Sequence, residues 1–386
     1  MWALLQAEDA ELLPYDCEGT LQHARRLHAA GLLSADELVE VERRLAEISS
    51  DDLERTDEDV HSAIERLLGD VGRKIHAGRS RNDQVATAHR LYVRDACEEA
   101  TRALRALALA ILGRAAAEAT TPMPGYTHLQ RAIPVTVGHH LLAWTEMLER
   151  DRARFAFASA QAEPSPLGAG ALAGSTLPLP APPNAMRNSI DAVADRDYAL
   201  DYLYACAALF VHLSRIAEEL VLWTSAEFGF ARLPEDAATG SSMMPQKLNP
   251  DVAELVRGKA GTALGRLAGL LATVKGLPLA YNSDLAEDKQ ATFRARRDVR
   301  LALPALARLV AGLELDRGRL AAAAADRLLR ATDAAEALVA QGVPFRDAHE
   351  QVAAQVRAGT FEAPAVTGER LGDVAAAVAA ARERWS

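Results

Sequence analysis

The chain has 386 residues, with 49% hydrophobic and 25% charged side chains, and a net charge of −10 from 53 acidic and 43 basic residues. This composition excludes a wholly disordered chain and argues against general nucleic-acid binding, which needs basic surfaces. No apolar run approaches the roughly 18 residues of a spanning helix, and the cysteines at 17, 97 and 206 form neither a disulfide framework nor a zinc pattern. We therefore expect a cytoplasmic protein with no membrane association and no metal site.

The sequence predicts an almost entirely helical chain, because Ala, Leu, Arg and Glu dominate and apolar residues recur at intervals of three and four. The first predicted helical region covers 18–48, is broken at Gly31 and has Ser34 as an N-cap, and a second begins at about 57. Long helices are then predicted over 84–119, 134–162, 197–228 and 249–276. Further helices continue to about 325, and a smaller helical region begins at 328. A turn is predicted at 120–125, and the proline-rich residues 164–183 are predicted to be an irregular crossing segment. No strand-like alternation of useful length is found.

The helix predicted from Asn249 has two features of its own. Asn249 suits the N-cap and Pro250 the first helical position. Gly261, Gly265 and Gly269 form a stripe without side chains, which would let a neighbouring helix approach closely and outweigh a penalty of about 1 kcal/mol per glycine. Long helices with this much apolar surface suggest a bundle completed by other subunits.

Lysine is scarce, since only five of the 43 basic residues are lysines, at 74, 247, 259, 275 and 289. Arginine has replaced most interchangeable lysines. A lysine that remains is therefore more often a residue whose compact ammonium is needed, because a planar guanidinium cannot reproduce it.

Four segments are candidates for chemistry. In Ala77-Gly78-Arg79-Ser80-Arg81-Asn82-Asp83, a helix start capped by Asp83 or Asn82 competes with an anion-binding turn made by helix amides and the two guanidiniums. In Gly125-Tyr126-Thr127-His128-Leu129-Gln130-Arg131, His128 suits proton transfer, although most lone histidines are structural or exposed.

The third segment, Thr239 to Pro250, combines glycine, serines and methionines with Lys247 and leads into a helix N-terminus. Lysine, asparagine and amide dipoles meeting there would stabilise developing negative charge; the alternative is a flexible connector. The fourth segment, Ala280 to Lys289, is polar and carries a second scarce lysine. Its alternative interpretation is a solvated turn with a local Asp–Lys pair.

These motifs carry a family resemblance. Gly-Ser-Ser-Met-Met-Pro-Gln-Lys-Leu-Asn-Pro at 240–250 resembles the signature of the fumarase/aspartase superfamily of lyases. Within it, the motifs at 78–84, 126–132 and 281–285, together with Asp57-Glu58-Asp59-Val60-His61 and Gly342-Val343-Pro344-Phe345-Arg346, resemble the argininosuccinate lyase family. The resemblance runs from about Tyr15 nearly to the end of the chain.

The resemblance implies an all-α subunit of three domains, at 1–78 (N-terminal, helical), 79–322 (central long-helix bundle) and 323–386 (small, C-terminal, helical). It implies a homotetramer with a twenty-helix core and with sites each assembled from three chains. The implied reaction is the reversible cleavage of argininosuccinate to arginine and fumarate, without a cofactor.

The resemblance also implies roles for individual residues. The implied catalytic residues are Ser241 as base, His128 as acid or relay, Glu254 as a residue that orients His128, and Lys247 as a stabiliser of the carbanion; the acid and base roles of Ser241 and His128 stay interchangeable. Six positions match family positions that hold the substrate: Arg81, Asn82, Thr127, Asn249, Tyr281 and Lys289.

This sequence departs from the family pattern at three places. Met1–Leu13 is unrelated to the usual N-terminal segment of the family, which carries a substrate-contacting serine. Ala286 and Ile133 stand at positions where the family usually has glutamine. Losing one polar contact to substrate would cost on the order of 1–3 kcal/mol. Two alternatives therefore stay open: a related lyase acting on another N-succinyl or aspartate-like substrate, and a catalytically silent structural relative.

Overall fold

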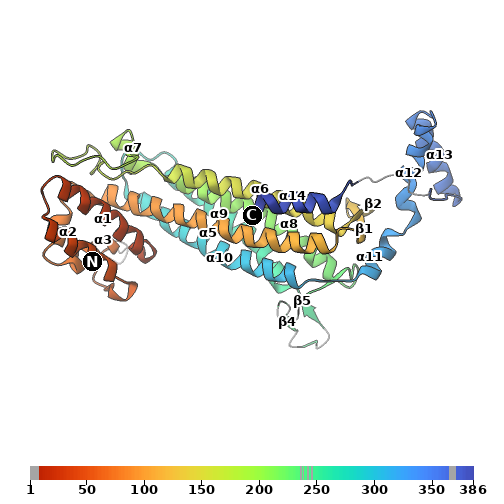
Figure 1. The fold of residues 1–386 in the computed structure, drawn as a ribbon, viewed down its shortest axis with the longest axis horizontal. Helices are drawn as coiled ribbons and strands as arrows, with labels where there is room; N and C mark the ends of the chain where they lie inside the picture. Colours follow the sequence, from red (N-terminus) through yellow and green to blue (C-terminus); the bar gives the residue numbers. More distant parts are fainter. Residues whose placement is uncertain (1–7, 235–236, 238, 241–242, 245–246, 365–370) are drawn as a thin grey trace. The chain divides into compact units, whose positions relative to one another are not determined.

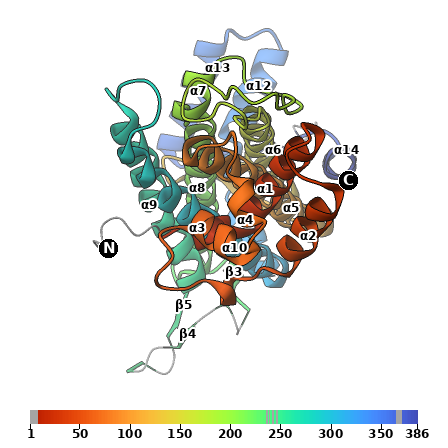
Figure 2. The same cartoon turned by 90° about the vertical axis from the view of Figure 1, so that its left-hand side faces the viewer.

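The computed structural model describes residues 8–234, 237, 239–240, 243–244, 247–364 and 371–386 (Figures 1 and 2). The chain divides into two compact units. Unit 1 contains the residues up to Ala103 with 151–211 and 259–301, and unit 2 contains 104–150, 212–258 and 302–386. The long helices each contribute a section to both units; they are α5 (Arg81–Ala117), α6 (Val137–Ala162), α8 (Asp197–Thr224), α9 (Asp251–Val274) and α10 (Asp288–Gly312).

Unit 1 adds short helices to its sections of the long ones. These are α1 (Leu13–Ala29), α2 (Ala35–Glu47), α3 (Val60–Leu68), α4 (Gly72–Ile75), α7 (Ser189–Ala194) and the 3₁₀ turns η2 (Ala10–Leu12), η3 (Ser50–Asp52) and η5 (Ser283–Glu287). The predicted break at Gly31 and the predicted cap at Ser34 are both confirmed. Ser34 Oγ accepts from the Glu37 amide at 3.2 Å, and the Glu37 carboxylate accepts from the Ser34 amide at 3.0 Å, which completes a capping box.

Aromatic side chains lie between the long helices of unit 1. Tyr92 of α5 packs edge-on against Phe293 of α10, with ring centroids 4.8 Å apart. Phe155 of α6 and Tyr202 of α8 are fully buried with centroids 6.1 Å apart. Buried rings of this size account for much of the apolar area that holds such helices side by side.

The segment between α6 and α7 is irregular, as predicted from its prolines. It is held by hydrogen bonds at both ends, because the Ser165 amide donates to Asn184 O at 2.8 Å and the Met186 amide donates to Ser165 O at 2.9 Å. Arg26 of α1 donates from Nε to Pro180 O at 2.7 Å. We refer to residues 163–188 as the crossing segment.

Unit 2 contains the short strands. The hairpin of β1 (Pro122–Thr127) and β2 (Gln130–Thr136) is antiparallel, and so are the pairs of β3 (Ala231–Arg232) with β6 (Glu314–Leu315) and of β4 (Thr239–Gly240) with β5 (Leu248–Asn249). The helices that complete unit 2 are α11 (Arg317–Ala324), η6 (Arg327–Arg330), α12 (Ala331–Ala340), α13 (Phe345–Ala358) and α14 (Val374–Trp385). Helices α12 and α13 pack around a small core of their own, with Ala335, Ala348, Val352 and Phe361 buried.

The all-α fold class is thus confirmed, but the sequence analysis missed the hairpin. It placed a turn at 120–125, but only residue 120 lies in a turn there, whereas 122–125 begin β1 and the turn of the hairpin lies at His128 and Leu129. Three prolines and a bulge interrupt the alternation of these strands, so their pattern did not predict a hairpin. In the part of the chain that the structure describes, no helix is long and apolar enough to cross a membrane.

The glycine stripe of α9 has no neighbour among the described residues of this chain. A Cβ built on Gly261, Gly265 or Gly269 would meet no described atom within 4 Å. Leu255, Leu264 and Leu271 of the same helix are 67%, 49% and 48% exposed. A helix that carries this much uncovered apolar surface is typical of an assembly interface.

Candidate active site

The ten predicted site residues are distributed over both units. Arg81, Asn82, Tyr281 and Lys289 belong to unit 1, whereas Thr127, His128, Lys247, Asn249 and Glu254 belong to unit 2. Ser241 lies outside the described residues. Each group is described within its own unit.

The start of α5 is tied to the crossing segment. Ser80, which precedes the helix, accepts from the Asn82 amide at 3.2 Å and donates from its own amide to Asp83 at 2.9 Å, so Ser80 takes the cap position expected of Asn82 or Asp83. The second oxygen of Asp83 accepts from the amides of Gly168 and Gly170, at 2.9 and 3.0 Å. The Asn82 side chain donates to Ala171 O at 3.2 Å. Asn82 is therefore held in place inside unit 1.

The two arginines of the first motif have different surroundings. Arg81 is half-exposed, donates to Gln84 at 3.3 Å, and its nitrogens lie 3.7 and 3.9 Å from carboxylate oxygens of Asp59 and Glu65, so it faces solvent and can bind an anion. Arg79 is buried and donates to Thr20 Oγ1 at 2.9 Å; burial lowers its pKa. The expectation that both guanidiniums hold a ligand is wrong for Arg79, because its side chain points into the interior beside α1.

Lys289 belongs to a buried charged cluster centred on Asp288. Its ammonium donates to Asp288 Oδ1 at 3.0 Å, while Arg196 donates to Oδ2 and His89 Nδ1 lies 3.4 Å from the same oxygen. Burial opposes ionisation of Asp288, but the charge of Lys289, with those of His89 and Arg196, outweighs it and holds the pKa of Asp288 well below its usual range. The predicted local Asp–Lys pair is present, but it is buried and not solvated.

A second buried pair joins α1 and α3. His61 Nδ1 is 2.8 Å from Asp16 Oδ2, and Gln84 donates to both oxygens of Asp16, at 3.1 and 3.0 Å. Burial would lower the pKa of His61, but the charge of Asp16 raises it. The sequence analysis missed Asp16, His89 and Arg196, and the burial of Asp288, because a single charged residue in a helix carries no sign of burial.

The hairpin displays Thr127 and His128 at its tip. Thr127 pairs with Gln130, and the two residues between them, His128 and Leu129, have φ of 54° and 55°, as a type I′ turn requires. Non-glycine residues in this region cost of order 1–3 kcal/mol each and concentrate at functional sites. Both Thr127 and His128 are exposed.

Packing at the base of the hairpin fixes this turn. Gly125 lies at a bulge where a Cβ would stand 2.6 Å from Ile133 O, so only glycine fits. The Tyr126 ring packs on Phe228 and Phe230, with centroids 5.6 and 6.4 Å apart. The hairpin is therefore a rigid support for an exposed histidine.

The segment around Lys247 is closed at its base by a two-residue ladder. Gly240 pairs with Leu248 and Thr239 with Asn249. The ladder therefore pairs the residue that precedes Ser241 with the residue that follows Lys247. Lys247 is exposed. Asn249 lies in β5, and α9 begins at Asp251, so the expected N-cap at Asn249 and first helical residue at Pro250 are wrong by one or two positions.

Glu254 and Tyr281 complete the predicted set. Glu254 is exposed on the first turn of α9, where a carboxylate suits the helix dipole, and lies 3.7 Å from Arg257. Tyr281 is half-buried and follows Ala280, whose φ is +63°. Ala286 is exposed on η5, two residues before Asp288.

These residues include two cations, Arg81 and Lys247, a helix N-terminus at the start of α9 and an exposed histidine, His128. Such groups suit binding of a carboxylate substrate and stabilisation of negative charge that develops on it. Among the described residues, no group of three or more His, Cys, Asp or Glu side chains has the arrangement of a metal site.

Known proteins resemble the chain over most of its length. A family model described as Lyase matches residues 8–265, and one described as Argininosuccinate lyase C-terminal matches 328–380. A protein named argininosuccinate lyase from Frankia casuarinae is 51% identical over 89% of this chain and 78% of its own length, and one of that name from Synechococcus sp. strain JA-3-3Ab is 47% identical over 90% and 75%.

Solved structures agree on the fold. An EDDS lyase crystallised with formate superposes with a TM-score of 0.79 at 28% identity, over 97% of this chain and 80% of that one. A class II fumarase from Schistosoma mansoni, at 14% identity, shares the fold with a TM-score of 0.76 over 94% and 89%. The extent of these similarities, together with the motifs placed above, shows that the chain belongs to the argininosuccinate lyase family.

Proposed function

We propose that this protein is a carbon–nitrogen lyase that cleaves argininosuccinate reversibly to arginine and fumarate, in cytoplasmic arginine biosynthesis. The observation that carries the proposal is the 51% identity to a relative of that name over 89% of the chain. The motifs around Arg81, His128 and Lys247 support it, because each supplies a residue that this elimination needs.

The elimination needs a base for a carbon-bound proton, a sink for the carbanion and an acid for the leaving nitrogen. In the transition state the carboxylate beside the carbanion carries about two negative charges, so cations and amides aimed at it lower the barrier. None of these tasks calls for a cofactor.

Lys247 and the start of α9 are proposed as the carbanion sink. Lys247 precedes β5, and β5 leads directly into α9, so an ammonium and a positive helix end stand next to each other along the chain. Lys247 is exposed within the chain and therefore free to meet a substrate.

Ser241 and His128 are proposed as the proton-transfer pair, with Ser241 as base and His128 as acid or relay. Glu254 is proposed to orient His128. The six remaining residues, Arg81, Asn82, Thr127, Asn249, Tyr281 and Lys289, are proposed to hold the carboxylates and the amino-acid end of the substrate.

We propose that the protein assembles as a homotetramer with sites shared between chains. We also propose three domains per chain, at 1–78, 79–322 and 323–386. The uncovered glycine stripe and exposed leucines of α9 support it, because they offer a close-packing face for the twenty-helix core. No nucleic acid or membrane takes part.

The direct test is to incubate the purified protein with argininosuccinate and to follow fumarate by its absorbance. The proposal predicts fumarate and arginine in equal amounts. A folded oligomer that releases no fumarate would contradict it.

One observation favours a second candidate, a lyase for another N-succinyl amine. Ala286 is exposed on η5 and has no side-chain hydrogen-bonding group where the family has glutamine. A screen with adenylosuccinate, aspartate and other succinyl amines tests it, and a larger kcat/KM for one of these than for argininosuccinate would establish it.

A further inference from the structure

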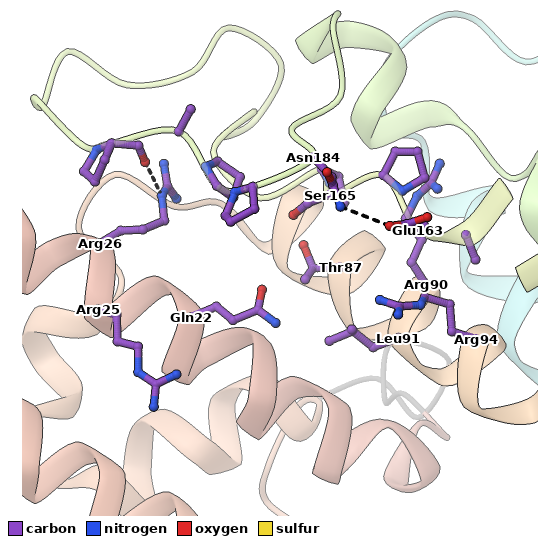
Figure 3. A pocket seen from close by; sticks show the side chains of 17 residues that line it. Gln22, Arg25, Arg26, Thr87, Arg90, Leu91, Arg94, Glu163, Ser165 and Asn184 are labelled. Atoms are coloured by element: carbon purple, nitrogen blue, oxygen red, sulfur yellow. Dashed lines mark hydrogen bonds between the residues drawn. The ribbon is translucent and has the colours of Figure 1, made fainter. Parts of the chain in front are cut away.

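A cavity of about 450 Å³ lies in unit 1 between α1, α5 and the crossing segment (Figure 3). Its lining includes four arginines, Arg25, Arg26, Arg90 and Arg94, but a single acidic residue, Glu163. No described member of the predicted active site lines it. Cavities of about 300–1,000 Å³ with a few convergent polar groups are typical of small-molecule sites.

Two of these arginines are already neutralised by carboxylates of the chain. Arg25 donates from Nε and Nη2 to Glu42 at 3.2 and 3.0 Å. Arg90 is buried, pairs with Asp195, donates to Gln161 O at 2.8 Å and lies over the ring of Tyr198. Neither needs a ligand to balance its charge.

Arg26 has only neutral hydrogen-bond partners. Its Nε donates to Pro180 O at 2.7 Å, and its Nη1 lies 3.2 Å from His23 Nδ1. His23 Nε2 lies 3.0 Å from Ala77 O and must carry the proton, so Nδ1 is the acceptor. Burial, with the charge of Arg79, lowers the pKa of His23 to about 3, so the ring is neutral. The positive charge of Arg26 therefore has no hydrogen-bonded counter-ion among the described residues.

Arg94 is the second arginine of the cavity without a hydrogen-bonded counter-ion among the described residues. It is half-buried on α5, and it forms no hydrogen bond or ion pair with any residue that the structure describes. In Figure 3 Arg26 and Arg94 stand on opposite sides of the cavity, with Gln22, Thr87 and Leu91 between them. Glu163 accepts from Asn184 at 3.2 Å and keeps its negative charge, so the lining is positive by a smaller margin than its four arginines alone would give.

The walls of the cavity are formed before any ligand binds. Pro164, Pro166, Pro180, Pro182 and Pro183 line it, and proline has a fixed φ. The hydrogen bonds of Ser165 and Met186 hold the two ends of the crossing segment together. Little conformational entropy is lost when a ligand binds such a site, and its proline and leucine surfaces suit a hydrocarbon body.

We propose that this cavity is a binding site for a small organic dianion of the dicarboxylate class, with one carboxylate on Arg26 and the other on Arg94. Guanidinium groups bind carboxylates through paired, charge-assisted hydrogen bonds. The hydrocarbon chain of the ligand would lie against Leu91 and the proline wall. The site is positive although the whole chain carries a net charge of −10.

The test is isothermal titration calorimetry of the intact oligomer with glutarate, and with butyrate as the single-carboxylate probe. We expect glutarate to bind at least about tenfold more tightly than butyrate, because butyrate satisfies one arginine. Arg94→Gln and Arg26→Gln should each weaken glutarate binding by about tenfold or more, whereas Arg94→Lys should retain part of it.

Arg25→Gln is the matched control, because Arg25 also lines the cavity but is paired with Glu42; it should change the affinity by less than about twofold. Arg94 makes no contact that folding needs, so Arg94→Gln should keep the wild-type melting temperature. Glutarate bound in the proposed active site would be unaffected by Arg94→Gln. Equal affinity of wild type and Arg94→Gln, or no binding at about 10 mM glutarate, would overturn the proposal.

Discussion

The predicted site residues of the two units have contrasting surroundings. In unit 1, Lys289 is buried against Asp288, and Asn82 is hydrogen-bonded to the crossing segment. In unit 2, Thr127, His128 and Lys247 are exposed on a turn and a loop. Elimination through a carbanion needs a site from which water is excluded. Within one chain, Lys289 and Asn82 of unit 1 are therefore already held in place, while the exposed residues of unit 2 still need a cover, which we propose that other subunits supply.

The largest effect is expected from Ser241→Ala, which removes the proposed base. Loss of a general base lowers kcat by about 10²- to 10⁴-fold, whereas the assembly should be intact in a sizing experiment. Ser50→Ala, at an exposed residue of η3, is the control and should keep wild-type activity. Retained activity in Ser241→Ala would remove this residue from the mechanism.

Asp288→Asn tests whether charge holds the buried cluster around Lys289 in unit 1. Arg196 and Lys289 would lose their shared counter-ion, and breaking a buried pair in this way costs about 3–5 kcal/mol of unfolding free energy. Denaturant titration at one protein concentration measures it, because the stability of an oligomer depends on concentration. Asp284→Asn, at an exposed position of η5, should change the stability by less than about 0.5 kcal/mol. A similarly small loss for Asp288→Asn would mean that the cluster does not hold Lys289.

Gly265→Leu tests whether the α9 stripe is an interface. A Cβ added at this position meets no described atom within 4 Å, so the substitution points away from the packed part of the single chain, which should fold. Overpacking of a helix contact costs about 1–3 kcal/mol per interface, which should shift the protein towards smaller species in sedimentation velocity. Gly318→Ala, at an exposed glycine of α11 where an added Cβ makes only ordinary contact, should leave the assembly unchanged. An intact Gly265→Leu tetramer would place the interface elsewhere.

The smallest effect is a dependence of stability on pH within unit 1. The folded-state pKa of His61 is raised by Asp16, so its contribution is fully present below the unfolded value of about 6.5 and is lost as pH rises through the folded pKa. His23 has the opposite sign, because its pKa is lowered to about 3 and stability falls as pH drops from about 6.5.

Melting temperatures of wild type and His61→Gln between pH 6 and 9 measure this contribution. His61→Gln should remove the fall in melting temperature that wild type shows as the pH rises above about 6.5, because the charge of Asp16 raises the pKa of His61. His349→Gln, at an exposed histidine, is the control. An unchanged slope in His61→Gln would contradict a charged His61–Asp16 pair.

The sequence predicted the helical part of this fold well, because apolar periodicity and Ser34 capping are local properties. It missed the hairpin, since His128 and Leu129 adopt positive φ without the Asn-Gly signal that marks such turns. It also missed the clusters around Asp16 and Asp288. Burial there depends on residues from distant parts of the chain, such as His89 and Thr292, which are about two hundred positions apart and hydrogen-bonded to each other. The scarcity of lysine directed attention to Lys289, and the sequence suggested a local Asp–Lys pair there, but the burial of that pair with Arg196 and His89 was visible only in the structure.

Mixing two inactive variants tests two proposals together. The first is that Ser241 and His128 belong to the active site, and the second is that each site is shared between chains. Chains that carry Ser241→Ala and chains that carry His128→Asn are co-expressed with different tags, and the hybrid oligomers are purified. Each chain of a hybrid then lacks one of the two residues and retains the other. If the two residues of each site come from different chains, about a quarter of the sites receive both wild-type residues, and about a quarter of wild-type fumarate production should return. Hybrids as inactive as the single variants would contradict the shared-site account.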